Sequence, residues 1–189
     1  MTNLGQAGWN SDALINGDQG IESQLDRAVV ELESAVSEGR GAIALVWIGS
    51  NDLWYLYENG EGSDENDLAD INHFLTNMTT ILSSLRETGA VVIVALLDDQ
   101  SKRPVALRGE AFTGITGEEL SRMSVQVEQY NGIIAVKAGQ YGAILVDFYS
   151  TKIFTSSATL DDEGNHLNQI GYDLIAERWL NALAPFMVQ

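Results

Sequence analysis

The sequence predicts an α/β domain in which helices pack against a parallel β-sheet. Three apolar runs, at residues 42–48, 90–97 and 143–148, of which only the last is interrupted, by Asp147, are separated by longer amphipathic segments. Runs this short without polar alternation are typical of parallel strands that are covered on both faces. In the longer segments apolar residues recur every three or four positions, which is the period of a helix with one buried side. The two alternating patterns therefore indicate helices layered on a parallel sheet.

The first helix follows an irregular start. Residues 1–18 are rich in the turn formers Gly, Asn, Ser and Asp. A helical pattern then extends over residues 21–36, and two glycines end it. Its apolar side comprises Ile21, Leu25, Val29, Leu32 and Val36. The run 42–48 is expected to be a central strand, and the polar residues 49–52 follow at its carboxyl end.

The middle of the sequence repeats this arrangement. An acidic stretch over residues 58–65 is expected to form a surface loop beside the strand ends. It leads into a second amphipathic helix over residues 68–85, and the strand 90–97 follows. Polar residues, Asp98 to Gln100, again come directly after the strand. A longer connection containing Pro104 then leads to the next helix.

Local capping signals mark the last two helices. Thr116 and Glu119 have the spacing of a capping box, so a third helix is expected to follow Thr116. Asn168 is positioned to cap a final helix after the third strand. No internal repeat, linker or low-complexity segment interrupts the pattern, so residues 1–189 are expected to form a single domain.

Composition excludes several classes of partner and chemistry. The 189 residues include 10 basic and 27 acidic ones, which gives a formal net charge of −17. Such a charge repels nucleic acid and anionic membrane surfaces, so no nucleic-acid partner is expected. The absence of cysteine excludes disulfides and thiolate metal sites. No cluster with metal-ligand spacing and no glycine-rich phosphate loop is present, so we expect no metal and no cofactor.

The sequence predicts no transmembrane segment, because no apolar run approaches the length of a membrane span. Residues 1–6 have neither the basic nor the apolar region of a signal peptide. As written, the sequence predicts a soluble, cytoplasmic chain. A secreted protein is expected instead if the N-terminus is incomplete, so the compartment is left open.

Three polar clusters are expected to meet at one edge of the sheet, because each follows a strand or precedes a helix. They lie at residues 5–8, 49–52 and 163–166. Ligands bind at this edge in open α/β sheets. The third cluster places a histidine, His166, beside several acidic residues. A proton carrier at neutral pH next to a carboxylate is what a general base requires.

The three clusters resemble conserved sequence blocks of the SGNH (GDSL-type) hydrolases. Residues 3–8, N-L-G-Q-A-G, are similar to the second block of that family. Residues 49–52, G-S-N-D, are similar to the third block, G-x-N-D. Residues 163–172, E-G-N-H-L-N-Q-I-G-Y, resemble the fifth block, usually D-x-x-H-P-N-x-x-G-Y. The blocks occur in the family's order and at predicted strand ends.

The resemblance implies a flavodoxin-like, three-layer α/β/α sandwich with a parallel sheet. It also implies hydrolysis of small carboxylic esters by an esterase or lipase-like enzyme. Carried over to matching positions, His166 is the general base, and the main-chain N–H of Gly8 and the side-chain amide of Asn51 are oxyanion donors. Such donors each contribute roughly 3 kcal/mol in other acyl-transfer enzymes. Asp52 is interpreted as orienting the loop.

Two positions near the histidine depart from the family pattern. Glu163 stands where the family has an aspartate, three residues before the histidine. Its extra methylene moves the carboxylate, so Asp161 or Asp162 is an alternative partner for His166. Leu167 replaces the usual proline, which leaves the loop less rigid.

The family's first block, G-D-S, supplies the nucleophilic serine and a further oxyanion donor, and it is absent from this sequence. Residues 17–19, G-D-Q, share its first two letters, but an amide is no nucleophile. Ser11 and Ser50 are the hydroxyls nearest to the predicted site, and neither lies on a strained elbow after a strand. The nucleophile is therefore unknown.

The missing block has a structural consequence. In the family, the strand that carries it lies beside the strand equivalent to residues 42–48. Without that neighbour, residues 42–48 are expected to form an exposed edge with two uncovered faces. The missing part is expected to come from an upstream segment, a partner or a second copy of the chain. The alternative is a non-catalytic member that binds a ligand or serves as a subunit.

Each candidate residue also has a purely structural interpretation. His166 is the kind of residue found in a loop that caps a helix, and Asn51 and Asp52 fit an ordinary strand-to-helix cap. His73 lies within a helical pattern, so we expect it to be structural. The acidic residues 58–67 lack the spacing of an EF-hand.

Overall fold

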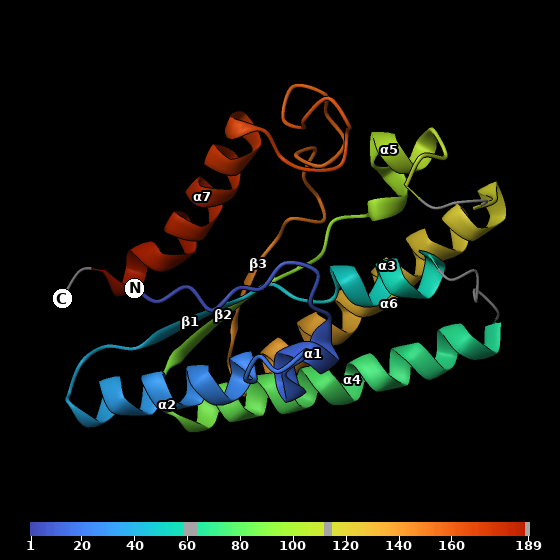
Figure 1. The fold of residues 1–189 in the computed structure, drawn as a ribbon. Coiled ribbons are helices and arrows are strands. Elements are labelled where there is room, and N and C mark those ends of the chain that lie inside the picture. Colours follow the sequence, from blue (N-terminus) through green and yellow to red (C-terminus); the bar gives the residue numbers. More distant parts are fainter. Residues whose placement is uncertain (59–63, 112–114, 188–189) are drawn as a thin grey trace.

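The computed structural model describes residues 1–58, 64–111 and 115–187, and its three strands are separated by helices as the sequence predicts (Figure 1). A short helix, Ser11–Asn16, lies within residues 1–18, which were expected to be irregular. In chain order they are α1 (Ser11–Asn16), α2 (Gln24–Ser37), β1 (Ile43–Val46), α3 (Ser50–Glu58), α4 (Asp64–Glu87), β2 (Val91–Ala95), a 3-10 turn η1 (Gln100–Lys102), α5 (Pro104–Leu107), α6 (Gly117–Tyr141), β3 (Ile144–Val146), α7 (Gln169–Leu183) and a second 3-10 turn η2 (Ala184–Phe186).

The three strands form one parallel sheet in the order β1-β2-β3. Ile43 pairs with Val91 between the first two strands, and Ala95 pairs with Val146 between the last two. Each strand lies inside the apolar run that predicted it. The runs are longer than the strands because apolar residues continue past the last paired position on the way into each loop.

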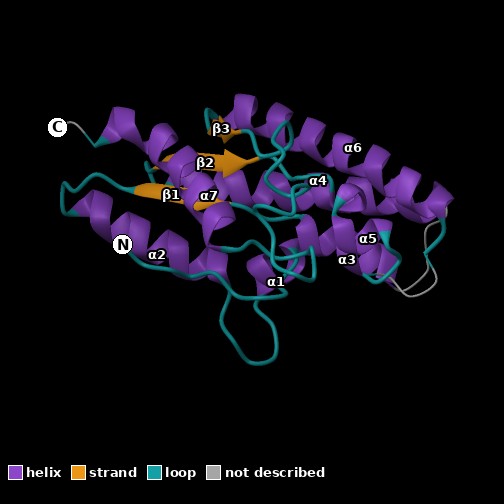
Figure 2. Cartoon of the chain, turned by 90° about the horizontal axis from the view of Figure 1, so that it is seen from above, coloured by secondary structure: helices purple, strands orange, loops and turns teal. Residues whose placement is uncertain are grey.

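Helices cover both faces of the sheet. On one face α2, α4 and α6 enclose a core in which the rings of Phe74 and Tyr130 stack with centroids 3.9 Å apart. On the other face α7 packs against β2 and β3 through Ile175 and Trp179. Figures 1 and 2 show α7 on the opposite side of the sheet from α2 and α4. The three-layer α/β/α arrangement with a parallel sheet is therefore confirmed.

β1 is not the central strand covered on both faces that its apolar run predicts, but the edge strand expected from the missing first block. β1 is an edge strand, paired only with β2 in the described part of the sheet. Val46 and Ile48 are buried under the helices of one face, whereas Leu45 and Trp47, which point to the other face, are 44% and 37% exposed. The expectation of two uncovered faces is also wrong, because α2 and α4 cover one of them.

Local capping chemistry determines where the helices begin. Thr116 and Glu119 form the predicted capping box at the start of α6, and the Asn168 side chain accepts from the N–H of Gly171 at the start of α7. The predicted start of the first helix is wrong. Ser23 caps α2, and Ile21 lies before the helix in an isolated bridge with Asp18.

Two short elements lie in the connection around Pro104. The turn η1 follows β2, and α5 begins at Pro104, whose ring suits the first helical position. Much of the acidic surface loop expected at residues 58–65 lies outside the described residues; α3 extends to Glu58 and α4 begins at Asp64. Within the described part of the chain, no helix combines the length and apolarity needed to cross a membrane.

Candidate active site

The carboxyl ends of the three parallel strands lie at the same end of the sheet. There β1 leads into α3, β2 leads into η1 and α5, and β3 leads into the irregular segment 147–168 (Figure 1). Both the Asn51 cluster and the His166 cluster therefore follow strands at this edge, as in other open α/β sheets that bind ligands there.

Gly49 makes the sharp turn between β1 and α3. Its φ is +118°, and a Cβ atom there would lie 2.9 Å from Leu97 Cδ1 and 3.0 Å from the Phe74 ring. Both the backbone conformation and the space require glycine. The turn places Asn51 in the first turn of α3, directly beyond the end of the strand.

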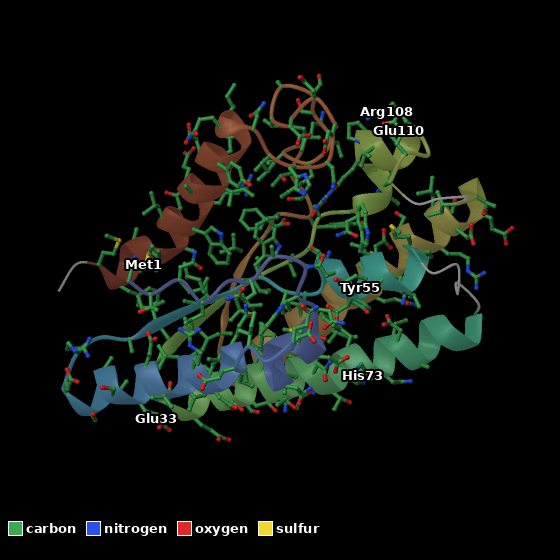
Figure 3. The ribbon with its side chains drawn as sticks, in the orientation of Figure 1. Met1, Glu33, Tyr55, His73, Arg108 and Glu110 are labelled. Carbon is green, nitrogen blue, oxygen red and sulfur yellow. The ribbon has the colours of Figure 1, made fainter. Side chains whose placement is uncertain are left out.

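The structure brings Asn51 next to the segment that contains Gly8. The Nδ2 atom of Asn51 donates to the carbonyl oxygen of Trp9 over 2.9 Å. The Tyr55 hydroxyl, on the next turn of α3, donates to the carbonyl oxygen of Gly8 over 2.7 Å. Figure 3 shows Tyr55 on α3. These two hydrogen bonds fix the N-terminal segment against α3.

Ser11 and Asp52 make a second connection between the same two segments. The N–H of Ser11 lies 3.2 and 3.0 Å from the two carboxylate oxygens of Asp52, and its hydroxyl also donates to Asp52. Asn77 of α4 donates to the Ser11 hydroxyl over 2.8 Å. Ser11 is fully buried. Its hydroxyl therefore donates to one partner, accepts from another and is shielded from solvent, so it is not placed to attack a substrate.

Burial raises the pKa of the Asp52 carboxyl from 3.8 to about 6. The hydrogen bonds from Ser11 act in the opposite direction, because they favour the ionised form, and the charge of Asp70 raises the pKa further. Burial is the largest of these effects. The N-terminal segment thus holds the Asp52 side chain in place, but burial makes its ionised form less favourable than in water.

His166 lies in an exposed turn with two carboxylates near one ring nitrogen. Its Nδ1 atom is 3.7 Å from Asp161 Oδ2 and 4.0 Å from Glu163 Oε2, and its side chain is 69% exposed. The other oxygen of Asp161 accepts from the N–H groups of Gly164 and Asn165, over 2.9 and 3.3 Å. Asp161 is thus tied into the turn, whereas the Glu163 side chain is 76% exposed.

In the portion of the chain that the structure describes, the remaining candidates, Asp162 and His73, form no ion pair with His166. Asp162 is exposed, and its side chain has no ion pair or hydrogen bond among the described residues. His73 lies on α4, where its Nε2 atom is 2.8 Å from the Asp12 carboxylate, which supports a structural role (Figure 3). No serine hydroxyl in the described part of the chain bonds to His166.

Asp161, Glu163 and His166 also offer three potential metal-ligand atoms within 4.8 Å of one another. All three belong to the turn described above. Gly8 and Tyr55 line a hollow of about 370 Å³ in the surface beside the N-terminal segment. Its other walls come from α1 and residues 16–18. Trp9 also lines the hollow, whereas neither Asn51 nor His166 does.

The contacts of Trp9, Tyr55 and Asn77 were not predicted from the sequence. Each joins residues that are more than 40 positions apart, so no local pattern announces it. Topology predicted that the clusters at residues 5–8 and 49–52 meet, but no local pattern predicted which atoms make the contact.

A sequence model of the GDSL-like Lipase/Acylhydrolase family matches residues 1–174. The chain belongs to this family. The match covers most of the sequence and includes all three polar clusters, so the chain is a member of a family of ester and acyl hydrolases. No curated protein sequence matches the chain significantly.

Several solved structures share the fold of this GDSL-like chain. An acetyl xylan esterase aligns with a TM-score of 0.58 and 16% identity over 95% of this chain and 78% of its own. A GDSL-like lipase from Bacteroides thetaiotaomicron gives 0.56 and 14% over 94% and 72%. An acetylxylan esterase from Geobacillus stearothermophilus gives 0.52 and 15% over 81% and 66%. At these identities the likeness shows a shared fold.

Proposed function

We propose that the protein is a carboxylic-ester hydrolase in which His166 is the general base and Gly8 and Asn51 are the oxyanion donors. The observation that carries the proposal is the hydrogen bond from Asn51 to Trp9, which fixes the Asn51 amide beside the Gly8 segment. An amide nitrogen has two hydrogens. One is used by Trp9, and the second is the donor assigned to the oxyanion.

The surroundings of His166 support its role as the base. Both nearby carboxylates lie on the Nδ1 side of the ring. A carboxylate there favours a proton on Nδ1, which leaves Nε2 to accept the proton of a nucleophile. Distances of 3.7 and 4.0 Å exceed those of a hydrogen bond. Catalytic hydrogen bonds are often long before substrate binds. Of the two, we assign the orienting role to Asp161, because it is nearer and held by the turn.

The nucleophile is proposed to come from outside residues 1–189, on a strand that pairs with the open edge of β1. The backbone groups on the open edge of β1 would then be hydrogen-bonded. A parallel strand in that position would end beside Gly49, next to the oxyanion donors. The source is an upstream segment, a partner protein or a second copy of the chain.

Two structural neighbours are esterases that act on acetyl xylan, so we propose small acetyl esters as substrates. The test is hydrolysis of p-nitrophenyl acetate by the wild-type protein, His166→Ala and His73→Gln. Turnover that is lost in the first variant and kept in the second supports the proposal. Labelling with a fluorophosphonate, followed by peptide mapping, identifies the nucleophile. Turnover unaffected by His166→Ala would overturn the assignment of the base.

A non-catalytic member of the family is the second candidate. It is favoured by one observation: no serine hydroxyl in the described residues bonds to His166. A well-folded protein that neither reacts with the fluorophosphonate nor hydrolyses p-nitrophenyl acetate would support this candidate. A labelled serine on any strand adjoining β1 would exclude it.

A further inference from the structure

The segment that follows β2 lies between the two halves of the proposed site. It comprises residues 98–108 and includes η1 and α5. On one side it contacts the residue before Asn51, and on the other it contacts the three residues before His166. Neither the family resemblance nor the sequence pattern assigns a role to this segment.

Arg103 makes the strongest of these contacts. Its Nε and Nη2 atoms donate to the two oxygens of Asp98, each over 2.8 Å, in a paired geometry that fixes the guanidinium plane. The third nitrogen, Nη1, donates to Asn165 Oδ1 over 3.0 Å. The guanidinium also lies 5.1 Å from the centre of the Phe154 ring. The side chains of Arg103 and Asp98 are only 12% and 4% exposed, so water screens this pair weakly.

Two further contacts hold the same turn from α5. The N–H of Val105 donates to the carbonyl oxygen of Gly164 over 3.3 Å, and Arg108 Nη2 donates to the carbonyl oxygen of Glu163 over 2.7 Å. Gly164 has a φ of +73°, and a Cβ atom there would lie 2.8 Å from Pro104 Cβ. Residues 103–108, which include α5, thus contact three successive residues of the turn, 163–165. Figure 3 shows Arg108 and Glu110 beside α5.

Gln100 makes the contact on the other side. Its Nε2 atom donates to the carbonyl oxygen of Ser50 over 3.0 Å, at the start of α3. Gln100 is buried, and its Oε1 atom has no hydrogen-bond partner among the described residues. A buried acceptor without a partner is unfavourable for folding. An apolar side chain of similar size would remove this cost but also the hydrogen bond to Ser50, so the two effects on stability should roughly offset each other.

We propose that Gln100 and Arg103 are positioning residues that hold the Asn51 loop and the His166 loop at a fixed separation. The proposal rests on the roles given to Asn51 and His166 above. Gln100 and Arg103 are three residues apart in one short, buried segment, so a single rigid piece of chain holds both loops. Because acyl transfer needs the base and the oxyanion donors around one carbonyl, their separation controls the rate.

The test compares Gln100→Met and Arg103→Lys with two controls on exposed helix and loop surfaces, Gln140→Met and Arg40→Lys. Amide hydrogen exchange is measured at residues 163–167 and 49–53, together with the melting temperature. We expect Arg103→Lys to speed exchange at 163–167 by about tenfold, as the loss of one hydrogen bond to a charged group implies. Gln100→Met should speed exchange at 49–53 without lowering the melting temperature. The controls should change neither region.

Kinetics with p-nitrophenyl acetate provide the second readout. We expect kcat to fall roughly 10- to 100-fold in both variants with KM nearly unchanged, because misplaced groups affect the reaction more than binding. In Gln100→Met this fall occurs without loss of stability, which a purely structural role would not produce. Unchanged exchange in both loops, or unchanged kcat in both variants, would overturn the proposal. If the wild-type protein shows no turnover even when the source of the nucleophile is present, the proposed function fails, and the exchange data alone decide whether the segment holds the two loops.

Discussion

The side-chain amide of Asn51 donates a 2.9 Å hydrogen bond to the main-chain carbonyl of Trp9, the residue that follows Gly8. The bond joins the start of α3 to the N-terminal segment, 42 residues earlier in the chain. Asp52 binds the same segment through Ser11. Adjacent side chains on one helical turn thus fix the position of the proposed Gly8 donor.

The role of the Asn51 amide leads to a prediction about two substitutions. Asn51→Ala removes the proposed oxyanion donor and the bond to Trp9, so kcat should fall by about 10²- to 10³-fold. The free energy of unfolding should fall by about 1 kcal/mol. Asn51→Asp keeps the size but cannot donate, so it should be equally inactive. Steady-state kinetics and urea unfolding measure both effects, with the exposed Asn181→Ala as control. Loss of stability without loss of kcat would contradict the proposed role.

The two carboxylates near His166 should contribute unequally. Asp161 is nearer to Nδ1, at 3.7 Å, and its second oxygen is fixed by the N–H of Gly164. Glu163 is more exposed and free to move away. We therefore expect Asp161→Asn to lower kcat by about 10- to 100-fold and Glu163→Gln to lower it less. Asp162→Asn should have the smallest effect. A larger loss in Glu163→Gln would assign the orienting role to the position that matches the family's aspartate.

Local sequence patterns predicted the helices and strands of this fold better than they predicted which of these elements pack against one another. The capping box at Thr116 and the cap at Asn168 depend on residues three apart, so the sequence alone reveals them. The apolar run of β1 predicted a strand correctly. Its edge position could not be read from that run and was expected only from the missing first block, because burial depends on which distant segments pack against the strand. For the same reason the bond between Arg103 and Asn165, across 62 residues, had no sequence signal.

The raised pKa of Asp52 predicts a pH dependence of stability. Because the folded protein holds this proton up to about pH 6 and the unfolded chain releases it near 3.8, the folded state binds more protons between these values. Stability contributed by this group is therefore fully present below about pH 4 and is lost as the pH rises to about 6. The difference in unfolding free energy between wild type and Asp52→Asn should change by up to about 3 kcal/mol across that interval. Urea unfolding from pH 4 to 8 measures it; a difference independent of pH would refute the shift.

Gly49, the glycine of the β1–α3 turn, should not be replaceable without loss of stability. Gly49→Ala forces a Cβ atom to within 3.0 Å of Leu97 and Phe74 at a φ of +118°. We expect a loss of about 2 kcal/mol in unfolding free energy. Gly132→Ala is the matched control, since Gly132 lies within α6 and a Cβ atom there would meet no atom within 4 Å. That variant should gain about 0.5–1 kcal/mol from helix propensity. Thermal or urea unfolding distinguishes the two signs.

The net charge of −17 should select against anionic substrates. A negative field lowers the rate at which anions approach the protein, and the effect is strongest when the Debye length is long, about 30 Å at 0.01 M salt. The ratio of kcat/KM for an anionic p-nitrophenyl hemiester to that for p-nitrophenyl acetate should therefore be low at about 10 mM NaCl. It should rise several-fold by about 300 mM, as screening shortens the range of the field, while the acetate rate stays nearly constant. Equal rates for the two esters at low salt would show that the charge does not act at the site.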